Sequence, residues 1–243
     1  YDCTSQWGVF SIAGPNSRRF LKKIVVSEDP DKNLSNKEFP WLSYRDIEIG
    51  MCPVRALRVA YTGELGWELH HPIEMQNYLL DILLSSGKEF NLKLVGARAQ
   101  NWLRQEKSYK AFGSDLGRDA GPFESNLSRF VDINKNFLGK DALLKRKTDV
   151  SCVTLLIDGP KDIDPWGREA LYNETEEVML GRLTSAGYSV HFKRSIGIGY
   201  VKSSFSEVGT KLRIKIDDAF WDAEIVRDSP YDPQNERIID RVQ

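Results

Sequence analysis

Residues 61–72, YTGELGWELHHP, hold the densest group of side chains in this chain that could do chemistry. Two glycines, two carboxylates and two adjacent histidines fall between a strand-like run and a helix-like run. A plain hairpin, a metal site and a small-molecule site all use residues of these types. The spacing of the residues has to separate these three interpretations.

The two histidines argue against a metal site. On a strand, His70 and His71 point to opposite faces, so they cannot bind one ion in the usual same-face geometry. The third histidine, His191, lies far away in the sequence, and no cysteine pairs have metal-ligand spacing. The chain also lacks a Gly-x-Ser-x-Gly elbow, and its GELG and GIG stretches are too short for phosphate loops. We therefore predict no metal, no catalytic nucleophile and no nucleotide-phosphate site.

A small-molecule site fits the alternation of the strand. If residues 67–71 are extended, Glu68 and His70 share one face, and Trp67 and Leu69 lie on the other face with His71. A fixed carboxylate can accept paired N–H bonds from a flat heterocycle, and an aromatic ring such as Tyr61 can stack on it. A solvated hairpin would show the same alternation, and the residues alone favour it, because exposed polar residues are common on half-buried strands.

Arg104, in the segment LRQEKS, also has two interpretations. Its guanidinium can pair with a carboxylate one helical turn away, or it can hold a ligand carboxylate bidentately. The residues alone favour the ion pair. The tryptophans at 41, 102, 166 and 221 favour core or rim packing over a stacking box.

The elements that must position these residues follow from the periodicity. Residues 7–15 read as a strand, and 16–24 as a helix with Asn16 as its N-cap. Two strands joined at Ile49 and Gly50 come next, then the strand 67–72 and a helix over 73–87 that ends at Gly87. A second long helix is predicted from Val95 to Phe112. The order β-α-β-β-β-α predicts an α+β domain over residues 1–149.

From residue 150 the sequence pattern changes to strand-like segments that contain several glycines and show almost no helical periodicity. We therefore expect a separate all-β barrel or sandwich over residues 150–243. Composition gives the broad class: 34 Lys+Arg against 35 Asp+Glu disfavour a nucleic-acid partner, and no apolar run approaches the roughly 20 residues that span a bilayer. Three scattered cysteines indicate a reducing compartment.

Several motifs occur together in one order: VFSIAGPNSR, YTGELGWEL, LRQEKSYKAFGSDLGRDAGPFESNL and FLGKDAL. With these motifs the chain resembles the tetrahydrofolate-binding module shared by the glycine cleavage T-protein (aminomethyltransferase) and the C-terminal half of dimethylglycine and sarcosine dehydrogenases. The tail SAGYSVHFKRSIGIGYV resembles the dehydrogenase branch more closely. Where T-proteins carry an Arg-Asp pair, this chain has Gln100 and Asn101, a departure that disfavours glycine-cleavage activity.

The resemblance implies a ferredoxin-like α/β lobe followed by a β-barrel, and a tetrahydrofolate site. It implies that Tyr61 lies against the folate and that Glu68 pairs with the polar edge of the pterin. Leu69 and His70 would line the same pocket, and Arg104 matches the second arginine of the family's Leu-Arg segment. This resemblance favours the small-molecule interpretation of the opening stretch.

The resemblance also implies a reaction: capture of an iminium carbon derived from an N-methyl amine as 5,10-methylenetetrahydrofolate. FAD would belong to an upstream domain, and the family's catalytic aspartate lies in an N-terminal segment outside this sequence. We therefore expect a piece of a longer chain that is inactive alone, from bacterial cytoplasm or the mitochondrial matrix. The alternatives are a stand-alone aminomethyltransferase or demethylase, and a non-catalytic regulatory subunit like that of pyruvate dehydrogenase phosphatase.

Overall fold

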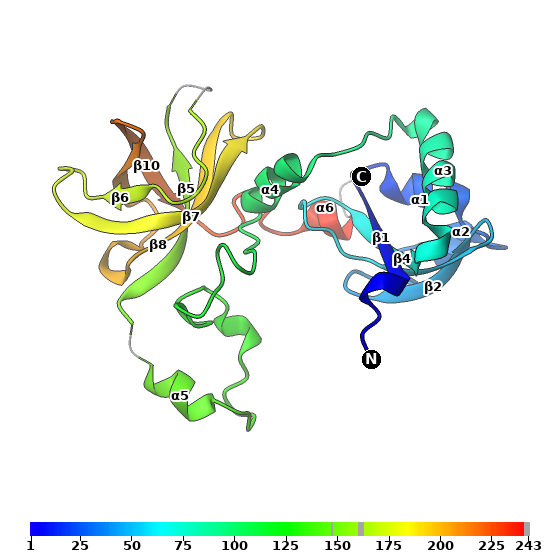
Figure 1. The fold of residues 1–243 in the computed structure, drawn as a ribbon, viewed down its shortest axis with the longest axis horizontal. Helices are drawn as coiled ribbons and strands as arrows, with labels where there is room; N and C mark the ends of the chain where they lie inside the picture. The colour runs from blue at the N-terminus through cyan, green and yellow to red at the C-terminus, as the bar shows by residue number, and fades with distance from the viewer. Residues whose placement is uncertain (147, 160–162, 241–243) are drawn as a thin grey trace. The chain divides into compact units, whose positions relative to one another are not determined.

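The computed structural model describes residues 1–146, 148–159 and 163–240, which fold as two compact units (Figure 1). Unit 1 comprises Tyr1–Gln100 together with the C-terminal residues from Asp232 onward. Unit 2 comprises Asn101–Tyr231. The chain therefore passes from one unit to the other twice, and unit 1 is discontinuous in sequence.

Unit 1 is an antiparallel sheet covered on one face by helices. Its elements are β1 (Trp7–Ala13), α1 (Ser17–Ile24), α2 (Pro30–Asn33), β2 (Tyr44–Ile49), β3 (Cys52–Leu57), β4 (Gly66–Pro72), α3 (Gln76–Gly87) and α6 (Glu236–Ile239), with 3₁₀ turns at Thr4–Gln6, Ile73–Met75 and Lys88–Phe90. The strand order is β1-β4-β3-β2. Apolar residues of α1 and α3 pack with those of the sheet in one core. The predicted order β-α-β-β-β-α is confirmed, with the short helix α2 added between α1 and β2.

The hairpin of β2 and β3 forms because its apolar residues alternate. Every second residue of β3 is buried, and the two strands pair from Ile49 with Cys52 out to Tyr44 with Leu57. Gly50 makes the tight turn in the left-handed region, with φ +58°, where a side chain would be strained. The Tyr78 hydroxyl accepts the Met51 N–H at 3.1 Å, so α3 holds the turn.

The predicted helix ends are close to the observed ones. Asn16 is at the N-cap of α1, although its side chain makes no capping hydrogen bond. Gly87 is the last residue of α3 but stays right-handed, and the left-handed residue is Asn91, with φ +54°, after a 3₁₀ turn. A Cβ on Gly87 would lie 2.7 Å from Leu92 Cβ. This glycine therefore permits close packing after the helix rather than a left-handed cap.

Unit 2 contains a closed antiparallel barrel with strand order β10-β5-β8-β7-β6-β9. Its elements are α4 (Ala97–Glu106, most of which lies in this unit), α5 (Lys140–Lys145), β5 (Val150–Ile157), β6 (Ala170–Tyr172), β7 (Met179–Ser189), β8 (Arg194–Lys202), β9 (Lys211–Ile216) and β10 (Ala219–Val226), with 3₁₀ turns at Ser128–Phe130 and Ser203–Phe205. A continuous apolar cluster fills the barrel. The predicted fold class, an α+β lobe followed by an all-β barrel, is confirmed.

The compact units do not divide the chain at residue 149. Residues 101–149 pack with the barrel, because polar side chains after the middle of α4 bond to barrel strands. Arg104 donates to the Ser185 hydroxyl at 2.6 Å, and the Ser108 and Thr154 hydroxyls lie 2.7 Å apart. Side chains that a helical pattern assigns to solvent are thus buried here, and the boundary by packing falls at Gln100.

Candidate functional site

Strand β4 lies inside the sheet, between β1 and β3, and separates its side chains cleanly between two faces. Trp67, Leu69 and His71 are fully buried on the helix-covered face. Glu68 and His70 lie on the opposite, open face, where both side chains remain partly exposed. The alternation predicted from the sequence is therefore observed.

Glu68 and His70 contact each other on this open face. His70 Nε2 lies 3.2 Å from Glu68 Oε2, and the two side chains are 30% and 36% exposed. Within the described residues the second oxygen, Glu68 Oε1, has no hydrogen-bond partner. The pair thus forms a fixed carboxylate with acceptor capacity directed away from the core.

The neighbours of this pair follow from the sheet register. Ser11 of β1 and Leu57 of β3 flank Glu68, and Val9 and Arg55 flank His70 in the same way. Glu68 thus has a polar neighbour, Ser11, on one side and an apolar neighbour, Leu57, on the other. Such a surface suits a flat ring with a polar edge.

Arg55 and Asp46 form a separate ion pair on the open face. Arg55 donates to both carboxylate oxygens of Asp46, at 2.8 and 3.1 Å. This hydrogen bonding lowers the pKa of Asp46. Because Arg55 is engaged by Asp46, it does not neutralise Glu68.

Tyr61 lies in the bend that leads into β4, and its side chain is partly buried. Gly63 takes φ +81° in this bend, a conformation that favours glycine. The far end of the bend is tied down: Leu65 O accepts the Gly14 N–H at 2.8 Å and the Ser17 hydroxyl at 3.0 Å. The short glycine turn predicted from YTGELG is therefore anchored to the start of α1.

Thr62 is a polar residue of this bend that the sequence reasoning did not single out. Its hydroxyl is buried, and it has no hydrogen-bond partner in the described part of the chain. A buried hydroxyl without a partner is costly unless another group satisfies it. Only its position beside Tyr61 could have marked it, since threonine is common in turns.

Leu69 occupies the core and not the open face. It is 0% exposed and belongs to the apolar cluster beneath the sheet. Its carbonyl accepts a hydrogen bond from His71 Nδ1 at 2.9 Å. Leu69 can therefore contribute to a pocket on the other face only by fixing the strand on which Glu68 and His70 lie.

Arg104 belongs to unit 2, where its guanidinium is 2% exposed and fully engaged. It donates to the Asn101 side chain at 3.0 Å, to Tyr109 O at 2.8 Å and to Ser185, and it forms a buried ion pair with Asp115. The carboxylate partner expected from the sequence exists, but it lies in a loop beyond the helix. A periodicity argument could not find it.

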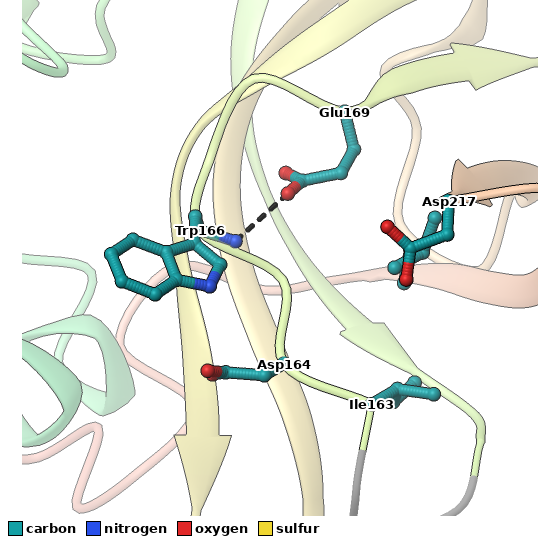
Figure 2. Close-up of a pocket in the computed structure, with 6 residues that line it drawn as sticks. Ile163, Asp164, Trp166, Glu169 and Asp217 are labelled. Atoms are coloured by element: carbon teal, nitrogen blue, oxygen red, sulfur yellow. Dashed lines mark hydrogen bonds between the residues drawn. The ribbon is translucent and has the colours of Figure 1, made fainter.

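A cavity of about 450 Å³ lies at one end of the barrel, beside Trp166 and Glu169. The Glu169 carboxylate accepts N–H bonds from Trp166, Gly167 and Arg168 at 2.8–2.9 Å, so it holds its own loop (Figure 2). The Trp166 ring is 74% exposed and points away from Glu169 and Asp217. Trp166 is therefore not part of the barrel core, and we assign no ligand to the cavity.

No group of three His, Cys, Asp or Glu side chains in the described ranges is placed to hold a metal ion. Among the same residues, no helix is long and apolar enough to cross a membrane. His70 and His71 point to opposite faces of the sheet, as the sequence predicts.

The α+β sheet with one open polar face, followed by a closed barrel, defines a two-part module of the glycine-cleavage T-protein class. Sequence models of that class match both parts: the GCVT N-terminal domain over residues 1–135, and the glycine cleavage T-protein C-terminal barrel domain over residues 151–232. The chain belongs to this family.

Relatives fall into two groups. Mitochondrial dimethylglycine dehydrogenase of Mus musculus is 37% identical over 232 residues, which cover 93% of this chain and 26% of the relative. An aminomethyltransferase of Caldanaerobacter subterraneus is 30% identical over 207 residues, or 85% of this chain and 54% of the relative. Mitochondrial sarcosine dehydrogenase of Mus musculus is 28% identical over 98% of this chain and 26% of its own length. The chain thus spans about a quarter of the dehydrogenases.

A solved structure shows the same fold. The crystal structure of glycine cleavage system aminomethyltransferase T from Bartonella henselae superposes with a TM-score of 0.78 at 19% identity. The match covers 93% of this chain and 60% of that chain.

Proposed function

We propose that the open face of β4 holds the pterin of tetrahydrofolate, and that this chain is the one-carbon-transfer module of a dimethylglycine- or sarcosine-dehydrogenase-like protein. The observation that carries the proposal is the placement of Glu68. Its carboxylate lies on the uncovered face beside His70, with Oε1 making no hydrogen bond within the described part of the chain. The likeness to the mitochondrial dehydrogenases supports the dehydrogenase context.

The polar groups beside β4 suit a pterin. The polar edge of a pterin presents neighbouring N–H groups, which a carboxylate can accept in pairs. The buried Thr62 hydroxyl, which lacks a partner among the described residues, is a second polar group in the same segment of the chain. Tyr61 would supply the stacking ring, and Leu69 would fix the strand from beneath. Arg104 remains a predicted ligand residue whose fork is already used inside unit 2.

The chemistry of such a module is mainly positioning. Tetrahydrofolate supplies the nucleophilic nitrogens, and an iminium formed from an N-methyl amine by an FAD domain supplies the electrophilic carbon. The residues of this chain bind and orient: Glu68 fixes the rotation of the pterin, and His70 holds the Glu68 carboxylate. Holding the two reactants in one geometry gives most of the acceleration. The compartment would be the mitochondrial matrix or the bacterial cytoplasm.

Titration of tetrahydrofolate into the wild-type chain and into Glu68→Gln tests this proposal. We expect the variant to bind at least about tenfold more weakly, because it loses a charge-assisted pair of hydrogen bonds. Glu48→Gln is the matched control, since it removes the same charge from an exposed position on the edge strand β2. Equal affinities of the wild-type chain and Glu68→Gln, or no binding by either, would overturn the proposal.

A further inference from the structure

Two buried arginines flank Trp67, the residue that precedes Glu68 on β4. Arg18 of α1 is 8% exposed, and Arg58, which follows β3, is 1% exposed. Their guanidinium carbons lie 5.4 and 5.9 Å from the centre of the Trp67 ring. Burial, and then the charge of Arg18, lower the pKa of Arg58 to about 10. Two like charges at one indole need an acceptor nearby.

The acceptors come from main-chain carbonyls and from the last described residues of the chain. Arg58 donates to Phe39 O at 2.6 Å and to Ile239 O at 2.9 Å. Arg18 Nε donates to the Asp240 carboxylate at 2.7 Å. We call residues 232–240 the C-terminal strap.

The strap is a built element of unit 1. The Asp232 carboxylate caps its short helix by accepting N–H bonds from Glu236 and Arg237, at 2.9 and 3.1 Å. Ile238 is 2% exposed, so its side chain is buried. Asp240 takes a left-handed conformation, with φ +61°, which ends the turn of helix beside Arg18.

The strap contacts both ends of the bend that carries Tyr61. At the start of the bend it accepts the hydrogen bond from Arg58 through Ile239 O. Near the end of the bend, Arg237 pairs with Glu64 at 3.6 Å. Tyr61 and the buried Thr62 hydroxyl lie between these two contacts in sequence. The position of the bend therefore depends on residues more than 160 positions away in sequence.

We propose that the C-terminal strap is a positioning element of the pterin site, in which Arg237 and Asp240 fix the Tyr61 bend through Glu64 and through the Arg18–Arg58 pair. The assignment rests on the proposed function, because the bend matters for ligand binding only if Tyr61 and Glu68 hold the pterin. Neither Arg237 nor Asp240 is needed as a ligand contact. Their effect is to order the bend before the ligand arrives.

The experiment uses the full chain with Arg237→Gln, Asp240→Asn and the control Lys22→Gln. Lys22→Gln also breaks an ion pair of unit 1, with Asp31, but on the exposed side of α1. Amide hydrogen exchange is measured without ligand on peptides covering residues 58–66, with residues 76–87 as the internal reference. We expect exchange in 58–66 to rise about tenfold in both strap variants, because a local opening becomes easier, and to stay unchanged in the control.

Tetrahydrofolate affinity is measured on the same proteins. The two strap variants should bind about threefold to tenfold more weakly, since the bend must then be ordered on binding. Arg237→Gln keeps the fold testable, because this side chain is 47% exposed. The double variant Glu64→Lys, Arg237→Glu restores the ion pair in reverse and should recover most of the affinity that Arg237→Glu alone loses.

The outcomes separate the two proposals. Unchanged exchange in residues 58–66 would overturn the role of the strap, whatever the affinities. Weak binding by Glu68→Gln together with wild-type affinity of both strap variants would overturn the strap and leave the pterin site standing. Raised exchange with wild-type affinity of Glu68→Gln would overturn the pterin site, and with it the ligand role of the strap.

Discussion

At the scale of single residues, the position of the Glu68 carboxylate depends on how its neighbours in β4 pack on the other face of the sheet. Trp67 and Leu69 are fully buried on either side of it, and His71 stacks on Phe10 with ring centres 4.9 Å apart. A strand fixed in this way cannot rotate or slip without exposing two large apolar side chains. The exposed carboxylate therefore has a defined position, as a recognition site requires.

The two interpretations of Arg104 lead to different results in one experiment. Lysine cannot reproduce the fork that contacts Asn101, Asp115 and Ser185, so Arg104→Lys should reduce the free energy of unfolding by about 3 kcal/mol. Urea unfolding followed by circular dichroism measures this. The exposed Arg129→Lys should change stability by less than about 0.5 kcal/mol. A loss of tetrahydrofolate affinity without a loss of stability would instead assign Arg104 to the ligand.

The residue types of the candidate site could be read from the sequence, but their partners could not. Alternation along the strand identified Glu68 and His70 as neighbours on one face. It could not show that Arg18 and Arg58 meet at Trp67, because their separation of 40 positions follows no helical or strand period. Contacts of this kind depend on how whole elements pack.

At the scale of elements, Glu124 ties the segment 124–148 to the barrel. Its carboxylate accepts hydrogen bonds from Arg146 and Thr148 at 3.0 and 2.9 Å, and its carbonyl accepts the Cys152 N–H at 2.7 Å. Both ends of a long segment are therefore fastened at one 7% exposed side chain.

Acid should release this anchor. Burial acts to raise the pKa of Glu124, but hydrogen bonds from its own backbone, Thr148 and Arg146 outweigh burial, and the pKa lies below 4.5. A carboxyl whose pKa is lowered by folding stabilises the fold at pH values above its pKa in the unfolded chain. This stabilisation is lost as the pH falls through its pKa in the folded chain. We expect Glu124→Gln to be less stable at pH 7 and to lose less stability below pH 4.5 than the wild type.

Urea unfolding at a series of pH values between 3 and 7 gives the free energy of unfolding of each protein as a function of pH. The wild-type curve should fall more steeply in the acid range, because only the wild type protonates Glu124 there. Glu174→Gln is the control, since Glu174 is an exposed carboxylate of the same unit. Parallel pH curves for the wild type and Glu124→Gln would contradict the role of this anchor.

The elements that alternation or helical periodicity specifies were predictable, and the others were not. The hairpin of β2 and β3 turns at Gly50 as predicted, and β4 begins one residue before its predicted start. The helix expected from Val95 to Phe112 ends at Glu106, because Arg104, Glu106 and the residues after them turn toward the barrel. Helical periodicity assigns charged side chains to solvent, so it could not predict that Arg104 and Glu106 are buried.

At the scale of the whole molecule, each unit has a separate core and one buried thiol. Cys52 lies in the core of unit 1, and Cys152 lies in unit 2, where burial raises its pKa to about 12. Cys3, by contrast, is exposed. The thiols can therefore report separately on the two units.

Thiol labelling in increasing urea should show this separation. At low urea one thiol, Cys3, should react quickly, because labelling requires the exposed thiolate. Cys52 and Cys152 should then become reactive at urea concentrations that differ between the two units, since the cores are distinct. Mass spectrometry of the labelled peptides identifies each site. Simultaneous labelling of both at every urea concentration would show that the units unfold together.

The discontinuity of unit 1 affects how the chain is made. A ribosome synthesises the sheet and its helices first, and then the entire barrel, before Asp240 emerges to meet Arg18 and Arg58. Until then the nascent sheet carries two neighbouring positive charges without their carboxylate. The first unit to be translated is thus the last to be completed, and a gene fragment that stops at residue 231 would encode it without its final piece.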